Sequence, residues 1–330
     1  MTSLRPASIH FISSEEAEAV LKYDDLIPMI ESALADFSRG QEGGVVQPLR
    51  TVFPIEQHRG AFFAMPCYSR NSNVLSCKLL TRYPPAEDVA QVPPIRTITA
   101  LFDACNGSLQ AILESESITS MRTAAASAVA TKFLAPDDSK VLAILGAGSQ
   151  AKAHLDALRH VITFEEVHVW NRTYARAEAF AAKYGCVAYK TVKEAVENAD
   201  VIVTATSSHK PILWKDWVKD GAHINCVGAA RSHQQELDPV LVRHAVIYAD
   251  SREGALSESG DVIISKAEVY GEIGEIVTGK LQARKNETTI FKSLGLAIQD
   301  AVAAKLVYDR LARTENQHSS DSIPTTYSDL

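Results

Sequence analysis

The stretch VLAILGAGSQA, residues 141–151, decides the fold class of this chain of 330 residues. Its apolar half, Val141 to Leu145, predicts a buried strand, and the pattern G-x-G-x-x-A follows without a gap. A strand that turns through glycines into a helix is typical of a dinucleotide-binding unit, because the free N–H groups at the helix start face the phosphates. The residues expected to hold a diphosphate are Gly146, Ala147, Gly148, Ser149 and Gln150.

Strands and helices alternate strictly after residue 140. Strands are predicted over 141–145, 167–170, 201–205, 223–227 and 246–249, with helices over 149–160, over 174–183 and from the capping pair Thr191 and Glu194. Helices of this length join parallel strands, so the sequence predicts an α/β fold with a Rossmann-type doubly wound sheet. Ligands bind such a sheet at the carboxyl ends of its strands, which adds Thr206, Ser207 and Val227 to the expected cofactor site.

The loop after the second of these strands indicates which nicotinamide cofactor the site takes. An NAD site places Asp or Glu about 20 residues beyond the first glycine, where the carboxylate holds the ribose 2′-hydroxyl. Here the loop reads Trp170-Asn171-Arg172-Thr173 and has no carboxylate. A guanidinium beside amide and hydroxyl donors suits a 2′-phosphate, so the sequence predicts NADPH.

The first 120 residues have a mixed pattern. One helix is predicted over 15–38, followed by strands over 50–53, 61–65, 74–80, 97–102 and 109–113, of which the last two join at Asn106-Gly107. This pattern predicts an open, largely antiparallel α+β layer. Lys78 lies in the middle of an apolar strand, where a lysine is costly to bury unless it is paired. A functional lysine is therefore expected there.

The end of the chain is predicted to return to the first domain. An amphipathic helix is expected over 297–311, and the polar segment 313–330 is expected to be a disordered tail. The expected domains are therefore a substrate and dimerisation domain, 1–121 with 297–330, and a cofactor domain, 122–296.

The bulk composition excludes several function classes. A formal net charge of −7 and a pI near 5.8 argue against a general nucleic-acid-binding protein. The sequence offers neither a signal peptide nor an apolar stretch of membrane-spanning length. Its five cysteines are scattered without a CxxC pair, so we expect free thiols, a cytoplasmic location and no metal site.

Several longer motifs together resemble one family. They are Gln47-Pro48-Leu49-Arg50-Thr51, Ser76-Cys77-Lys78-Leu79, Ile118-Thr119-Ser120-Met121-Arg122-Thr123-Ala124-Ala125, Glu258-Ser259-Gly260-Asp261-Val262 and Phe291-Lys292-Ser293-Leu294-Gly295. With the cofactor motifs, they make residues 9–312 similar to the ornithine cyclodeaminase/mu-crystallin family, and most similar to its mu-crystallin branch. The resemblance implies a Rossmann domain and a second domain that forms a homodimer.

The resemblance also implies roles for the candidate site residues. Arg50 and Arg122 would hold a substrate carboxylate, which suits the paired donors of a guanidinium. Lys78 would hydrogen-bond that carboxylate or donate a proton to the reacting nitrogen. Glu258 would contact a ring nitrogen or an amine, and Ser293 would lie near the nicotinamide.

One position separates this chain from part of the family. Ornithine cyclodeaminases and the alanine dehydrogenase branch have an essential aspartate where this chain has Ala230. The resemblance therefore implies hydride transfer from NADPH to a cyclic ketimine carboxylate of the pyrroline, piperideine or thiomorpholine type. Two alternatives stay open: a binding or storage protein, with thyroid hormone as the implied ligand, and amino-acid dehydrogenase or cyclodeaminase chemistry.

The loop at 170–173 generates a first prediction. Replacing the guanidinium in Arg172→Ala is expected to weaken NADPH binding far more than NADH binding, because only NADPH carries the 2′-phosphate. Titration of both cofactors against wild type and variant measures the difference. An equal loss for both would show that Arg172 does not contact the 2′-phosphate.

Overall fold

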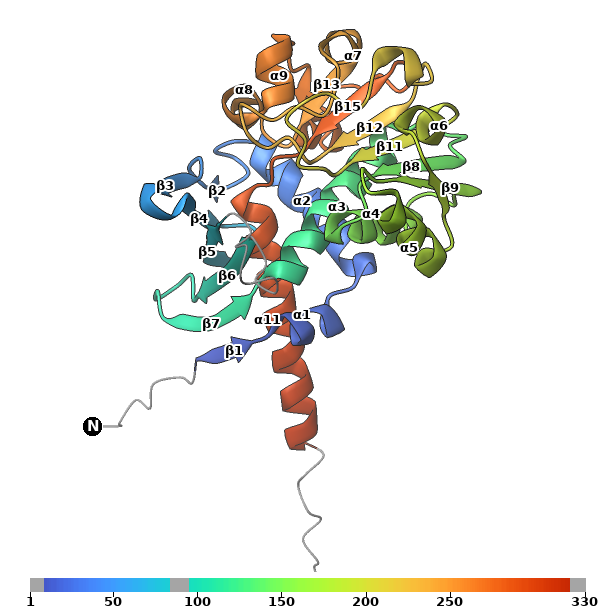
Figure 1. Cartoon of the computed structure of the whole chain (residues 1–330). Coiled ribbons are helices and arrows are strands. Elements are labelled where there is room, and N and C mark those ends of the chain that lie inside the picture. The colour runs from blue at the N-terminus through green and yellow to red at the C-terminus, as the bar shows by residue number, and fades with distance from the viewer. Residues whose placement is uncertain (1–8, 84–94, 321–330) are drawn as a thin grey trace, which may run out of the picture.

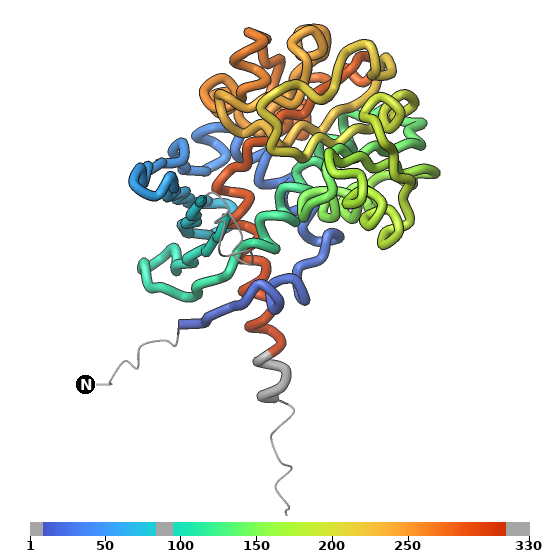
Figure 2. The backbone as a smooth tube through the Cα atoms, in the orientation of Figure 1, coloured from blue at the N-terminus to red at the C-terminus, as the bar shows by residue number. Residues whose placement is uncertain are grey.

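The computed structural model describes residues 9–83 and 95–320, with the backbone alone described for 315–320. Its two sheets lie on either side of a central group of helices (Figure 1). Figure 2 shows the path of the chain: it forms one sheet, crosses to the other, and returns beside the first sheet in its last helix.

The second sheet has eight parallel strands in the order β10-β9-β8-β11-β12-β15-β13-β14. The strands are β8 (Val141–Leu145), β9 (Glu166–Trp170), β10 (Val187–Tyr189), β11 (Val201–Thr204), β12 (His223–Cys226), β13 (Val246–Ala249), β14 (Gly271–Glu272) and β15 (Thr289–Lys292). The predicted strands are confirmed, whereas β10, β14 and β15 were missed. The miss of β15 matters most, because this late strand lies between β12 and β13.

Helices cover both faces of this sheet, as a doubly wound fold requires. They are α4 (Ser149–Arg159), α5 (Tyr174–Tyr184), α6 (Val192–Val196), α7 (Pro239–His244), α8 (Arg252–Glu258), α9 (Gly260–Ser265) and α10 (Ile273–Val277). Strand β8 shows why both faces are filled, since Leu142 and Ile144 belong to one apolar cluster and Ala143 and Leu145 to another. The predicted capping pair is also confirmed, with Thr191 capping α6.

The first part of the chain forms a seven-stranded sheet in the order β1-β7-β6-β5-β4-β2, with β3 also paired to β4. The strands are β1 (His10–Ile12), β2 (Val45–Val46), β3 (Thr51–Ile55), β4 (Gly60–Ser69), β5 (Val74–Arg82), β6 (Ile95–Phe102) and β7 (Leu109–Glu114). All pairs are antiparallel except β1 with β7, which confirms the predicted layer. Alternate residues of β5, such as Val74, Ser76 and Lys78, are buried beneath the last helix.

Two helices connect the sheets. Helix α3 (Glu116–Leu134) is buried on nearly all sides, because its alanines let α2, α4 and α11 pack closely around it. Helix α11 (Ala297–Ser320) starts five residues after β15 and lies against the inner face of the first sheet (Figure 1). Residues from both helices therefore reach the space between the two domains.

Two predictions for the termini were wrong. The single helix expected over 15–38 is two helices, α1 (Ser14–Val20) and α2 (Tyr23–Ser38), because Leu21 and Lys22 adopt extended backbone. The tail expected to be disordered from residue 313 is helical to Ser320, with 321–330 outside the described residues. Polarity alone does not end a helix, and no proline occurs between residues 297 and 323.

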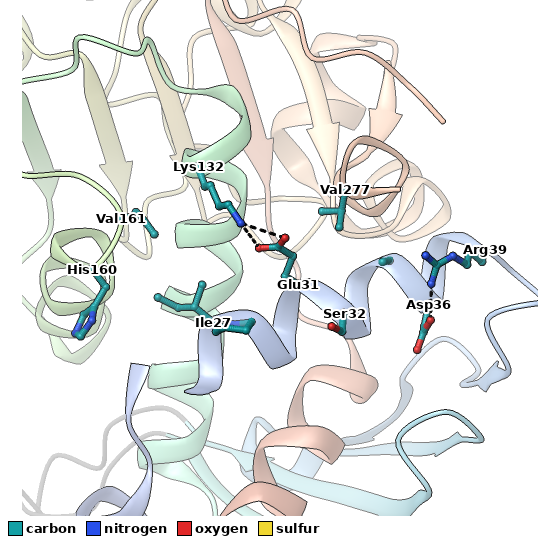
Figure 3. A pocket seen from close by; sticks show the side chains of 11 residues that line it. Ile27, Glu31, Ser32, Asp36, Arg39, Lys132, His160, Val161 and Val277 are labelled. Atoms are coloured by element: carbon teal, nitrogen blue, oxygen red, sulfur yellow. Dashed lines mark hydrogen bonds and ion pairs between the residues drawn. The ribbon is translucent and has the colours of Figure 1, made fainter. Parts of the chain in front are cut away.

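An open groove on the outer surface lies along α2, beside α3 and α10 (Figure 3). Its charged groups pair with one another, Lys132 with Glu31 at 2.9 Å and Arg39 with Asp36 at 2.8 Å. No candidate site residue lines it. Among the described helices, none combines the length and apolar character that crossing a bilayer requires.

Candidate active site

Three charged side chains meet in the interior between the first sheet and the two connecting helices. The ammonium of Lys78, on β5, lies 2.8 Å from Oδ1 of Asp300, on α11. The guanidinium Nε of Arg122, on α3, lies 3.0 Å from the same oxygen. All three residues are at most 5% exposed, so each charge depends on its partners. We call Lys78, Arg122 and Asp300 the ion triad.

The lysine of the ion triad is held in one direction and has a shifted pKa. Its Nζ also donates to Thr119 Oγ1 at 2.7 Å. Burial lowers the pKa of the Lys78 ammonium to about 8, the positive charges of Arg122 and Arg50 act in the same direction, and Asp300 opposes them. Lys78 is thus buried and paired, with a pKa below the usual range of a lysine, and its functional role stays a prediction.

Arg50 and Glu258 form a second pair. Arg50 Nε lies 3.0 Å from Glu258 Oε2, and its Nη2 donates to the carbonyl oxygens of Leu294 and Gly295 at 2.8 and 3.1 Å. Burial raises the pKa of the Glu258 carboxyl, and the Arg50 charge opposes that rise. Both side chains are about one-fifth exposed. Glu258 therefore contacts an arginine in this structure, and its expected contact with an amine stays a prediction.

The turn between β15 and α11 brings the two arginines together. Gly295 has a φ of +83°, and a Cβ atom there would lie 2.4 Å from Arg122 Nη1. The backbone N–H groups of Leu294 and Gly295 donate to Asp250 Oδ2 at 2.8 and 2.7 Å. Asp250 directly follows β13. Through these two hydrogen bonds it holds the turn that both Arg50 and Arg122 lie against.

A small cavity opens beside this turn. It has a volume of about 90 Å³ and is lined by Arg50, Glu258 and Gly295 together with apolar side chains such as Phe37 and Met65. An apolar wall with a few convergent charged groups suits a small organic acid.

The cofactor edge of the parallel sheet has the geometry that its glycine motif predicts. Gly146 has a φ of +128° and approaches β11 so closely that a Cβ would lie 2.6 Å from Ala205 O. Next to Gly148 the space is open, with no atom within 4 Å of a Cβ position. Helix α4 starts there without a side-chain cap. An open space before uncapped N–H groups fits a diphosphate.

The loop at 170–173 lies next to the glycine turn, because Gly146 N donates to Trp170 O at 2.8 Å. Asn171 Nδ2 bonds to Thr173 O at 3.0 Å, which shapes the loop. Arg172 is exposed and makes no ion pair with the described residues. The residues that were expected to hold a 2′-phosphate therefore lie beside those expected to hold the diphosphate.

The other candidate cofactor residues follow the neighbouring strands along the same edge. Leu145, Thr204, Cys226 and Lys292 pair in register across β8, β11, β12 and β15. The residues that follow these strand ends, Thr206, Ser207, Val227 and Ser293, therefore lie along one edge, and their contact with a cofactor stays a prediction. Ser293 is buried and donates from its backbone to Cys226 O at 3.1 Å.

A carboxylate that the sequence analysis missed holds two of these loops together. Glu236 accepts hydrogen bonds from Thr206 N at 2.7 Å and Thr206 Oγ1 at 2.6 Å, in the loop after β11. It also accepts from Gly228 N at 2.9 Å and Ala229 N at 3.2 Å, in the loop after β12. Glu236 therefore sets the spacing of the two loops where a nicotinamide would lie.

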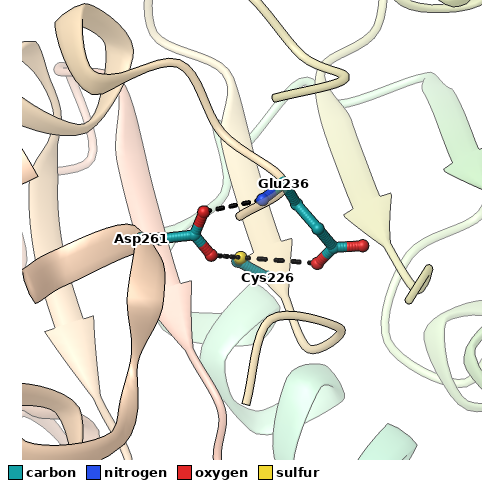
Figure 4. Close-up of side chains that lie close together, drawn as sticks. All are labelled: Cys226, Glu236 and Asp261. Atoms are coloured by element: carbon teal, nitrogen blue, oxygen red, sulfur yellow. Dashed lines mark hydrogen bonds between the residues drawn. The ribbon is translucent and has the colours of Figure 1, made fainter. Parts of the chain in front are cut away.

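Beneath these loops, Cys226, Glu236 and Asp261 lie close enough together to suggest metal ligands (Figure 4). The ammonium of Lys292 lies 3.4 Å from Cys226 Sγ and 3.3 Å from Asp261 Oδ2. Asp261 also accepts the backbone N–H groups of residues 236 and 237. Lys292 thus supplies the positive charge in this cluster. The carboxylates of Glu236 and Asp261 accept hydrogen bonds from backbone N–H groups.

The ornithine cyclodeaminase/mu-crystallin family profile matches residues 9–315. The chain belongs to this family. Ketimine reductase mu-crystallin of Macropus fuliginosus is 50% identical to it over 302 residues, which are 91% of this chain and 96% of the relative.

Solved structures of family relatives have the same fold. Δ1-pyrroline-2-carboxylate reductase of Thermococcus litoralis, in complex with NADH and L-proline, superposes with a TM-score of 0.86 at 34% identity and covers 93% of this chain and 98% of that chain. An archaeal alanine dehydrogenase dimer with bound NAD also has a TM-score of 0.86, at 30% identity and with 93% and 97% of the two chains covered.

A substitution at the turn tests how the site is assembled. Gly295→Ala is expected to weaken the binding of carboxylate substrates at least about tenfold, because the new Cβ would displace the Arg122 guanidinium. Gly279→Ala is the matched control, since Gly279 also has a positive φ, +72°, but no atom within 4 Å of its Cβ position. Both variants carry the backbone cost of about 1–2 kcal/mol. Equal KM values in the two variants would contradict the assignment of Arg122 to the substrate site.

Proposed function

We propose that this chain is an NADPH-dependent reductase of cyclic ketimine carboxylates, an oxidoreductase acting on C=N bonds. One observation carries the proposal: the ion triad holds two cations and one anion in the interior, next to the turn that follows the cofactor-edge strand β15. A substrate carboxylate would balance the remaining positive charge. The names of the relatives, a ketimine reductase and a pyrroline carboxylate reductase, support the same reaction class.

The residues of the chain bind and orient the substrate. Arg122 has guanidinium N–H groups beyond those bonded to Asp300 and Gln299, and these can take a carboxylate. At a pH below its pKa of about 8, Lys78 is protonated. Its ammonium donates hydrogen bonds to Thr119 and Asp300, which fix its position. Protonation of the imine nitrogen makes its carbon the better hydride acceptor, and Lys78 or a water beside it supplies the proton.

The open space at Gly148, the uncapped start of α4 and the edge residues fit a nicotinamide dinucleotide, which supplies the hydride when bound. The chain orients the two reactants relative to each other. We assign NADPH over NADH because Arg172 is exposed beside the diphosphate loop and no carboxylate occupies 170–173.

Ala230 disfavours the alternative of cyclodeaminase or dehydrogenase chemistry. It lies in the loop after β12, two residues beyond Gly228, at the cofactor edge. Its methyl group cannot activate water or ammonia, which those reactions require.

We also propose that the chain forms a homodimer through the domain of 1–121 and 297–330, with 122–296 as the cofactor domain. The support is an apolar surface on the face of the first sheet that points away from α11, where Phe53, Tyr68 and Ile98 are 37–53% exposed. All five cysteines are free, which suits the cytoplasm.

Light scattering at micromolar concentration tests the dimer. We expect twice the mass of 35.9 kDa for wild type and a shift toward monomer for the double variant Phe53→Glu with Ile98→Glu. Val187→Glu is the control, because Val187 is 50% exposed on the other sheet. A wild-type monomer would contradict the proposal.

Two substitutions test the reaction and its carboxylate clamp together. Lys78→Met and Arg122→Met are each expected to lower kcat/KM for a cyclic ketimine carboxylate, with NADPH binding retained. Loss of one partner of a buried charged contact costs about 2–5 kcal/mol, which corresponds to roughly a 30- to 5,000-fold fall. NADPH oxidation with a panel of ring imines, amino acids and keto acids measures the activity.

The control for this test is the same ring imine without its carboxylate. It should be a poor wild-type substrate and should lose much less in either variant, since the clamp has nothing to hold. Lys140→Met serves as the surface control, because Lys140 is 61% exposed in its pair with Glu165. If both imines lost activity equally, with a matching fall in melting temperature, the two residues would only brace the fold.

A further inference from the structure

Asp300 is the one acidic member of the ion triad, and its two oxygens differ. Oδ1 accepts from both Lys78 Nζ, at 2.8 Å, and Arg122 Nε, at 3.0 Å. Oδ2 is buried and has no hydrogen-bond partner among the described residues. Two cations thus share one oxygen atom, which places the ammonium and the guanidinium side by side.

Three charged groups act on Lys78, while strand β6, which pairs with β5, places the uncharged Thr99 opposite it. Helix α11 provides Asp300, helix α3 provides Arg122, and the segment before β3 provides Arg50. Strand β4 contributes Cys67, whose thiol pKa burial raises to about 12, so it is neutral. The remaining partner, Thr119, is uncharged. Asp300 is therefore the carboxylate that contacts both Lys78 and Arg122, whereas Glu258 pairs with Arg50.

We propose that Asp300 is a positioning residue of the reductase site, the counter-ion that keeps Lys78 charged and directed at the substrate carboxylate. The inference rests on the proposed function and extends it to a residue that need not touch the substrate. Without this carboxylate, Lys78 would face Arg122 and Arg50 in a buried site, and loss of its proton would be the least costly response. A neutral lysine binds a carboxylate less well and has no proton to pass on.

A merely structural role for Asp300 is disfavoured by the packing of its helix. The neighbouring Ile298, Ala301, Val302 and Ala304 are at most 1% exposed and belong to the main apolar cluster. These contacts attach α11 to the first sheet and α3 without any ion pair. Replacing a buried ion pair by apolar groups is often neutral for stability, so fold stability alone gives no reason for three buried charges here.

Asp300→Asn tests the proposal through the pH dependence of carboxylate binding. Pyrrole-2-carboxylate, a planar ring acid that cannot be reduced as an imine, is titrated by calorimetry into protein saturated with NADP⁺. In wild type, binding is expected to weaken as pH rises through about 8, where the Lys78 ammonium loses its proton. We call this fall in binding at high pH the alkaline limb. In the variant, the alkaline limb should move to lower pH by about 1–3 units, because the negative charge of Asp300 next to Lys78 is removed.

The control is Asp309→Asn, the same change on the same helix, at a pair with Lys305 in which both side chains are about one-third exposed. Its limb should coincide with that of wild type. An Asp300→Asn limb at the wild-type position, in protein with a normal melting curve, would overturn the proposal. If the asparagine variant does not fold, Asp300→Glu keeps the charge and should keep the limb while kcat for the imine falls. A shifted limb in that variant would overturn it too.

The binding readout separates this inference from the proposed function. If wild type reduces no ring imine, the proposed function fails, yet the alkaline limb of pyrrole-2-carboxylate binding still reports on Lys78 and Asp300. If wild type is active but the limb does not respond to Asp300→Asn, only the positioning role fails.

Discussion

A carboxylate shared by two buried cations joins three parts of the chain that are far apart in sequence. Lys78 comes from a central strand of the first sheet, Arg122 from the connecting helix α3, and Asp300 from the last helix. Removing one member of such a group would leave an unpaired charge in the interior, at a cost of about 3–5 kcal/mol. The elements that carry the three residues must therefore keep their relative positions. Gly295, next to Arg122, and Asp250, bonded to the Gly295 turn, hold the adjoining segment in place.

The same segment of chain serves both halves of the proposed reaction. Strand β15 ends at Lys292, inside the buried cluster beneath the cofactor loops, and Ser293 lies on the cofactor edge. The next residues form the turn that Arg50 contacts, and α11 then delivers Asp300 to Lys78. Hydride donor and acceptor have to lie about 3–3.5 Å apart, and a misplacement of about 1 Å can cost roughly 100-fold in rate. A short covalent connection between their two sites helps to keep that separation.

Much of this arrangement could be predicted from the sequence, for identifiable reasons. Strand β8 and the glycine turn combine an apolar run with a motif whose chemistry is local, and Lys78 is conspicuous because it interrupts an apolar strand. Asp300 could not be found in this way, since an aspartate near the start of an amphipathic helix is ordinary and its partner lies 222 positions away. Glu236 was missed for a similar reason, because its hydrogen bonds are to backbone of two separate loops. Strand β15 is only four residues long and ends in a lysine, which hides its buried character.

The position of β15 has a consequence for the way the chain is made. It pairs with β12 on one side and β13 on the other, although it follows both in sequence. A nascent chain that ends before residue 289 therefore carries two separate groups of strands, with exposed edges where β15 belongs. Asp300 follows within a dozen residues, so the parallel sheet and the ion triad are both completed only once residues 289–300 have been made. Until then Lys78 and Arg122 lack the counter-ion Asp300, and the site can acquire its final form only after residue 300 has left the ribosome.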